Sequence, residues 1–98
     1  MAIKRGKNAS SRNQGGENMA YSDEQVKDIF ELMTIVIENA TGKYSEYAKT
    51  YAEASFEAFV IYADDGLRMQ IPYVLANLQN WRGEEARFTK SALKEYIR

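Results

Sequence analysis

A row of basic side chains near the end of the chain is the feature best suited to bind another molecule. The row is spaced by three, four and four residues and comprises Arg87, Lys90, Lys94 and Arg98. On an α-helix this spacing brings the four cations to one face. A row of cations can bind the phosphates of a nucleic acid or the carboxylates of an acidic protein. The spacing therefore predicts a binding surface for a charged macromolecule.

Trp81 and Arg82 lie upstream of this basic row and extend the predicted surface. Aromatic and guanidinium side chains are common at the centres of protein interfaces, so we expect Trp81 to act as an anchor. Residues 72–97 also follow the order helix, short turn with Gly83, helix, which is the outline of a DNA-binding helix-turn-helix. In that alternative the same residues contact DNA. Bases towards the end of a helix are also favoured by its dipole alone, without any partner.

The charge of the chain is divided unevenly along its length. Residues 19–66 carry ten acidic and three basic side chains, whereas residues 67–98 carry three acidic and six basic ones. Acidic and basic regions of one chain can dock onto partners of either sign, and they can pair with each other across a twofold axis. The division favours a protein partner and is compatible with a homodimer.

The residue types present give little support for catalysis or metal binding. The chain has no histidine and no cysteine, so the commonest general base and the most reactive nucleophile are both missing. Carboxylates that could hold Mg²⁺ or act as acid and base occur at Glu46, Glu53, Glu57, Asp64 and Asp65. We interpret the three glutamates as a solvated helical face. We predict a protein that is not an enzyme and has no cofactor and no metal site.

The first part of the chain differs in composition from the rest. Residues 1–21 combine basic side chains with Gly, Ser and Asn, so we expect a disordered basic tail, followed by a helical domain over residues 22–98. The stretch from Gln14 to Met19 can be encoded by a ribosome-binding sequence and a start codon, so we hypothesise that the native product begins at Met19. We find no membrane span and no signal peptide, and therefore expect a cytoplasmic protein.

Periodic apolar residues predict four helices that position these groups. The first begins at Ser22, where Ser22 and Gln25 form a capping box, and ends at Thr41-Gly42. Because it is apolar on more than one flank, it is either deeply buried or part of a homodimer interface. The second carries small residues that allow a neighbouring helix to approach closely. The last three helices are expected over residues 44–64, 71–81 and 84–97.

The link between the second and third helices has two interpretations. Asp64-Asp65-Gly66 breaks the apolar pattern, and Asp-Gly between apolar runs is a strong hairpin signal. Against a hairpin, the helical period continues up to Tyr62, and Pro72 would interrupt a central strand but fits the first turn of the third helix. We therefore predict an all-α fold, a compact bundle of about four helices. The alternative is an α+β fold with a hairpin around Asp65-Gly66.

The last third of the chain, residues 70–98, carries a pattern within QIPYVLANLQNWRGEEARFTKSALKEYIR. The pattern consists of Tyr73, Leu75, Asn77, Trp81, Arg82, Gly83, Glu84, Ala86, Leu93 and Lys94. On these residues the segment resembles short uncharacterised proteins encoded by phages and prophages of Gram-positive bacteria. The resemblance implies a bacterial cytoplasm and a mobile element with its small accessory proteins. We expect a non-enzymatic accessory protein that binds another macromolecule, with a helix-turn-helix DNA-binding regulator as the alternative.

Overall fold

The computed structural model describes residues 20–97, and all regular structure in this range is helical. The elements are α1 (Asp23–Asn39), α2 (Ser45–Tyr62), α3 (Asp64–Ala76) and α4 (Glu84–Glu95). The predicted all-α bundle is thus confirmed, and the alternative α+β fold is wrong, because residues 20–97 contain no strand. Of the tail predicted over residues 1–21, residues 1–19 with the proposed start at Met19 lie outside the described residues.

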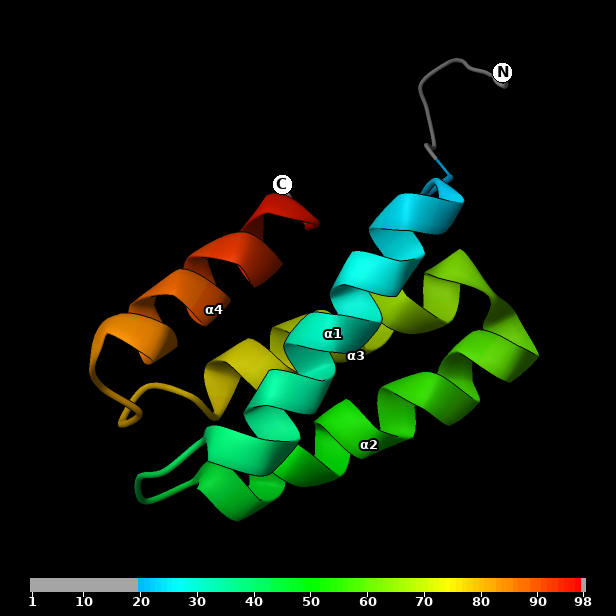
Figure 1. The fold of residues 1–98 in the computed structure, drawn as a ribbon. Helices are drawn as coiled ribbons and strands as arrows, with labels where there is room; N and C mark the ends of the chain where they lie inside the picture. Colours follow the sequence, from blue (N-terminus) through cyan, green and yellow to red (C-terminus); the bar gives the residue numbers. More distant parts are fainter. Residues whose placement is uncertain (1–19, 98) are drawn as a thin grey trace.

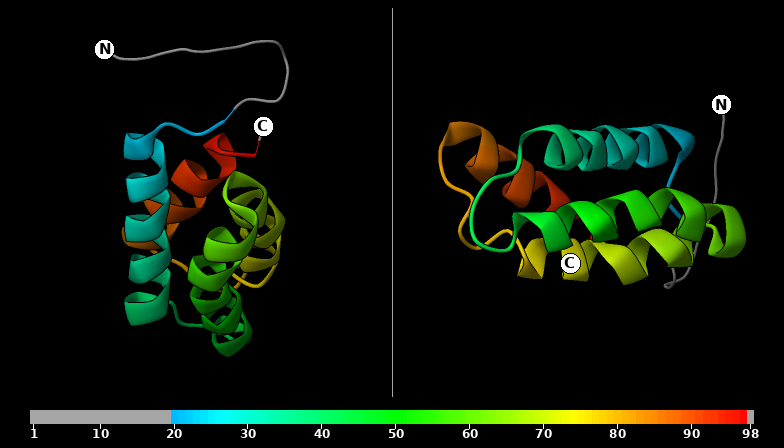
Figure 2. Two further views of the ribbon diagram at one scale, coloured as in Figure 1. Left: turned by 90° about the vertical axis from the view of Figure 1, so that its right-hand side faces the viewer. Right: turned by 90° about the horizontal axis from the view of Figure 1, so that it is seen from below.

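The four helices surround one core. Each helix packs against two neighbours, in the order α1, α2, α3, α4 and back to α1. As a result, α2 and α3 form an antiparallel helical hairpin on one side of the core, and α1 and α4 lie on the other (Figure 1, Figure 2). The outward side of the hairpin and the outward side of α4 therefore face different directions.

The capping box predicted at the start of the first helix is confirmed. The amide of Gln25 donates to the Ser22 hydroxyl over 3.1 Å, and the amide of Ser22 donates to the Gln25 side chain over 2.9 Å. α1 is apolar on more than one flank because it packs against both α2 and α4. Its fully buried residues are Ile29, Leu32, Met33 and Val36. The wide apolar surface of this helix is thus buried inside the monomer, which is the first of its two predicted interpretations.

The close approach of α2 and α3 depends on small residues, as predicted. A Cβ atom added to Gly66 would lie 2.2 Å from the carbonyl oxygen of Ala58, well inside van der Waals contact. Further along the hairpin, the rings of Tyr51 and Tyr73 stack with their centroids 5.1 Å apart. Gly66 therefore serves helix packing rather than a hairpin turn.

The third helix begins seven residues earlier than the sequence predicted. The break in the chain is the single residue Ala63, which has φ 55° and ψ −136°, and α3 starts at Asp64 rather than near Ile71. Asp64 and Asp65 occupy its first turn, where acidic side chains are favoured by the helix dipole. Pro72 therefore lies inside α3, on its exposed side, and not in the first turn.

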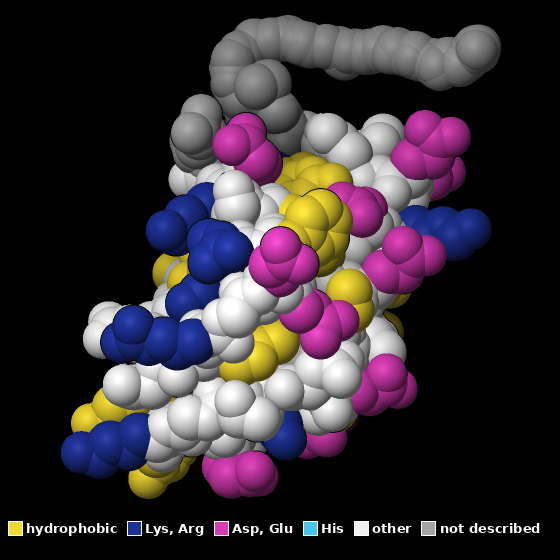
Figure 3. Space-filling model, turned by 60° about the vertical axis from the view of Figure 1, so that its left-hand side comes forward, with side chains coloured by type: hydrophobic (Ala, Val, Ile, Leu, Met, Phe, Trp, Pro, Cys, Tyr) yellow, Lys and Arg dark blue, Asp and Glu magenta, His cyan; other side chains and the backbone are white. Residues whose placement is uncertain are grey.

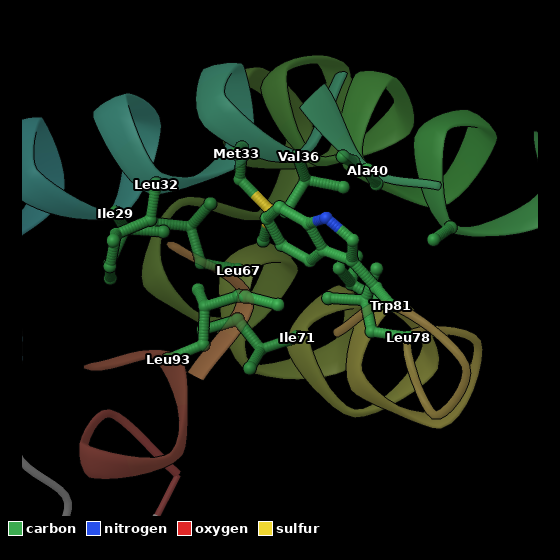
Figure 4. Packing of buried hydrophobic residues seen from close by; sticks show 14 residues of the cluster. Ile29, Leu32, Met33, Val36, Ala40, Leu67, Ile71, Leu78, Trp81 and Leu93 are labelled. Carbon is green, nitrogen blue, oxygen red and sulfur yellow. The ribbon is translucent and has the colours of Figure 1, made fainter. Parts of the chain in front are cut away.

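The core consists of buried aliphatic side chains from all four helices and of the indole ring of Trp81. Figure 4 shows the indole ring between Met33 and Val36 of α1 and Leu78 of the α3–α4 loop. The buried apolar residues of the other helices include Ala48, Ala52, Leu67, Ile71, Val74, Ala86 and Leu93. The described residues thus form one domain with one continuous core.

Tyr21, which the sequence placed in the disordered tail, is part of the folded domain. Its amide donates to Asp64 Oδ2 over 2.7 Å, and its hydroxyl donates to the carbonyl oxygen of Tyr96 over 2.6 Å. The guanidinium of Arg68 lies over its ring, 4.4 Å from the centroid. These contacts tie the segment before α1 to α3 and to the end of α4.

Candidate functional site

The predicted basic row lies on α4, but only part of it faces solvent. Arg87 and Lys94 are exposed on α4, and Arg82 is exposed on the loop that precedes it. Figure 3 shows dark blue side chains gathered on this side of the molecule, with acidic side chains concentrated beside them. Arg98 lies outside the described residues. The structure thus brings three of the predicted cations to one side of the molecule.

Lys90 is a structural residue rather than a free member of this row. Its ammonium group donates to the carbonyl oxygen of Leu78 over 3.1 Å and to that of Trp81 over 2.9 Å. These bonds hold the α3–α4 loop against α4. Burial lowers the pKa of Lys90, and the nearby charges of Arg82 and Lys94 lower it further. The prediction that Lys90 belongs to an outward binding row is wrong, because two of its three donors are used within the molecule.

Trp81 is buried and is not available as an anchor. Its side chain is only 4% exposed, because the turn from Leu78 to Trp81 directs the indole into the core. α3 stops at Ala76, so Trp81 lies on the α3–α4 loop and not at the end of the helix predicted over residues 71–81. The separate prediction of an interface hot spot at Trp81 is wrong in this conformation.

A cavity of about 270 Å³ lies between the α3–α4 loop and α4. It is lined by Gln79, Trp81, Arg82, Gly83, Arg87 and Lys90. Gly83, with φ 111°, is the N-terminal cap of α4, and no side chain caps this helix end. The cavity is thus bordered by three cations and a helix N-terminus, a setting that favours negatively charged groups.

The exposed cations of this surface form no ion pair with a described acidic residue. Ion pairs among residues 20–97 join Lys49 to Glu46 and Arg68 to Asp65. Within the same range, no carboxylate lies within ion-pair distance of Arg82, Arg87 or Lys94. Their charges therefore remain available to a partner.

Phe88 is an exposed apolar residue that the sequence reasoning missed. Its side chain is 65% exposed on the outer side of α4, and it directly follows Arg87 in the sequence. The signal was present in the helical period, because the inward residues of α4 are Ala86, Thr89 and Leu93, and Phe88 falls outside that stripe. We call the group formed by Arg82, Arg87, Phe88 and Lys94 the α4 surface.

The acidic residues that were considered as metal ligands or as an acid–base pair do not form a cluster within residues 20–97. The amide of Tyr21 donates to Asp64, Asp65 pairs with Arg68, and Glu46 pairs with Lys49. Within residues 20–97, no group of three or more acidic side chains is arranged to hold a metal ion. The glutamates of α2 lie on its exposed side, in line with their interpretation as a solvated face.

Comparison of the chain with protein-family models, curated proteins and solved structures gives no match. In the range 20–97, none of the helices has the length and apolar character needed to cross a membrane.

Proposed function

We propose that the protein is a small non-enzymatic accessory protein that binds an acidic region of another protein through the α4 surface. The observation that carries the proposal is that α4 and the loop before it expose both Phe88 and cations that have no ion-pair partner within residues 20–97. On the resemblance of residues 70–98, we place this activity in the cytoplasm of a bacterium, as part of a mobile element. Catalysis has no role in this proposal.

Phe88 and the exposed cations of the α4 surface have complementary roles in such binding. Burial of an exposed phenyl ring contributes about 1.5–3 kcal/mol to association. The exposed cations set orientation and association rate more than affinity. The cavity beside Arg82 and Arg87 is suited to a carboxylate side chain, since it is bordered by positive charge. A partner with an apolar pocket and neighbouring acidic side chains would match both features.

DNA binding is the second function that the exposed cations support. Two features of α4 favour a protein partner instead. Glu84 and Glu85 are exposed in its first turn, which is the part of a recognition helix that meets base edges and phosphates. The loop over residues 77–83 is also longer than the three or four residues typical of a helix-turn-helix.

The proposal is tested by affinity capture from the native host with four forms of the protein. These are the wild type, Phe88→Ala, Arg87→Ala and the control Lys49→Ala. Lys49 is a suitable control because it lies on α2, which packs against α1 and α3. We expect an acidic protein to be retained by the wild type and the control and to be lost from both α4 variants.

Two results would contradict this function. One is that Phe88→Ala and Arg87→Ala retain the same proteins as the wild type. The other is that the wild type retards duplex DNA in a gel, with a log–log salt slope of about −0.9 per phosphate contact, and that Arg87→Ala abolishes this binding. The second result would support the DNA-binding regulator.

A further inference from the structure

Five large apolar side chains lie exposed on the outward side of the α2–α3 hairpin. Each is between 52% and 65% exposed, and we call them the hairpin face: Tyr47, Ile61, Tyr62, Met69 and Tyr73. The stack of Tyr51 on Tyr73 joins the two helices across this face. The α4 surface is separate from it, because α4 packs against α1 and α3 and not along α2.

The spacing of residues along α2 explains why an apolar stripe faces outward. The stripe recurs at intervals of seven residues and comprises Tyr47, Ala54 and Ile61. A second stripe faces the core and comprises Ala48, Ala52 and Ser55. α2 is therefore apolar on two sides, and only one of them is covered by the described part of the chain.

The outward stripe is complementary to itself. Tyr47 lies seven residues before Ala54, and Ile61 lies seven residues after it. If two copies of α2 cross in antiparallel fashion at Ala54, Tyr47 of each copy meets Ile61 of the other. The small side chain of Ala54 at the crossing point allows the two helices to approach closely. A twofold axis repeats this contact, as required in an isologous interface.

The charged side chains of α2 restrict how a second copy can bind. Residues near a twofold axis meet their own equivalents, so a charged group there would face a like charge. The five members of the hairpin face are uncharged. Glu53 and Glu57 are exposed next to the stripe on α2, and the ion pair of Lys49 with Glu46 flanks Tyr47. The two copies can therefore meet through the apolar members, with these glutamates beside the crossing point and not at it.

The exposed area is large enough for a dimer. Five side chains of this size, each about half exposed, present about 500 Å² of mainly apolar surface. This is at the upper end of the largest patch on a typical monomer. Together with the alanines between them, they approach the area of about 800 Å² per partner that a stable interface buries.

From these observations we propose that the hairpin face is a self-association surface that binds a second copy of this chain, with the two α2 helices antiparallel and crossing at Ala54. The proposal is independent of the function proposed for the α4 surface. In the dimer the two α4 surfaces remain exposed, so the assembly would be bivalent and would bind a repeated partner more tightly through avidity.

The test is the mass in solution, measured by sedimentation velocity up to roughly 200 µM, because dimerisation depends on concentration. We expect the wild type to sediment at twice its 11.2 kDa monomer mass. Tyr47→Lys and Ile61→Glu should each give monomers. The double variant Tyr47→Lys/Ile61→Glu should dimerise again, because each new cation then meets a new carboxylate across the axis.

Val60→Glu is the matched control, because Val60 is 82% exposed beside Ile61 but points to the same side as Glu53 and Glu57. It should remain a dimer, as should Phe88→Ala. Circular dichroism checks that each variant is folded. If a single variant does not fold, Met69→Glu on α3 is used in its place and should also give a monomer. The proposal is overturned by a monomeric wild type, by folded single variants that remain dimeric, or by a folded double variant that stays monomeric.

Discussion

Tyr96 donates its phenolic proton to Asp28 over 2.5 Å and thereby joins the end of α4 to α1. Tyr21 packs edge-on against the same ring, with centroids 5.7 Å apart. Burial raises the pKa of Tyr96 to about 12, and the hydrogen bond to Asp28 contributes to this rise. The bond exists only while Tyr96 is protonated, so this contact between helices depends on pH.

The first prediction is an alkaline loss of stability through Tyr96. The folded-state pKa of about 12 lies above the ordinary value of 10.0, so the stabilisation is complete below about pH 10 and is lost as the pH rises from there through about 12. Tyr96→Phe has no proton to lose and should be less stable than the wild type at pH 8 but decline less above pH 10. Urea unfolding at a series of pH values measures both free energies. Tyr44→Phe, on the exposed α1–α2 loop, should follow the wild type, and an equal decline for Tyr96→Phe would refute the assignment.

A second prediction concerns the two lysines of α4, which the sequence treats alike. Lys90→Met removes the donor to the carbonyl groups of Leu78 and Trp81 and should reduce the free energy of unfolding by about 1–3 kcal/mol. Lys94→Met, an exposed change on the same helix, should stay within about 0.5 kcal/mol of the wild type. Chemical denaturation compares the two. Trp81 is the only tryptophan, so its fluorescence reports whether the loop has loosened. Equal stabilities of the two variants would show that the Lys90 bonds contribute nothing.

Gly66→Ala gives a third prediction, in which two effects oppose each other. Alanine is the better helix former by about 1 kcal/mol. Its Cβ atom, however, would meet the backbone carbonyl of Ala58 at 2.2 Å, and a backbone atom cannot move aside like the end of a side chain. Because the separation of α2 and α3 must then increase, we expect a net loss of about 1–3 kcal/mol in thermal or urea unfolding. A variant as stable as the wild type would mean that the hairpin can open without cost.

The fourth prediction is a stabilising change at Ala63. This residue has a positive φ of 55° with ψ −136°, a backbone conformation that glycine adopts readily and alanine does not. Relief of this strain exceeds the extra entropy of glycine in the unfolded chain, so Ala63→Gly should gain about 1 kcal/mol. For a domain of this size, the melting temperature should rise by about 4–8 °C. A fall in melting temperature would contradict the prediction and would mean that the chain entropy dominates.

Local features of the fold were predictable where the cause lies within a few residues of sequence. The capping box of Ser22 and Gln25 is of this kind, as is the inward stripe of α4. The start of α3 was missed because its break is Ala63, a residue type that gives no turn signal. Gly66 does give a turn signal, but its role is to allow α2 and α3 to pack closely. Only the tertiary structure reveals this interaction.

The candidate site was predicted only in part, because some of its contacts also depend on the tertiary structure. Helical spacing shows which way a side chain leaves its own helix, so it located Arg87 and Lys94 on α4. It does not show the path of the neighbouring loop, and that path decides that Lys90 bonds to the carbonyl of Trp81. The same helical spacing also predicts that Phe88 is exposed, because Phe88 does not share the side of α4 that carries the buried residues.

The hydrogen bond from Tyr21 to Tyr96 joins residues 75 positions apart and closes almost the whole folded chain into one loop. The entropy lost in closing so long a loop must be overcome before the contact stabilises anything. The α2–α3 hairpin, by contrast, needs only the single residue Ala63 to bring its helices together. The hairpin should therefore form early in folding and the Tyr21 contact late, so weakening that contact would accelerate unfolding and leave the folding rate nearly unchanged.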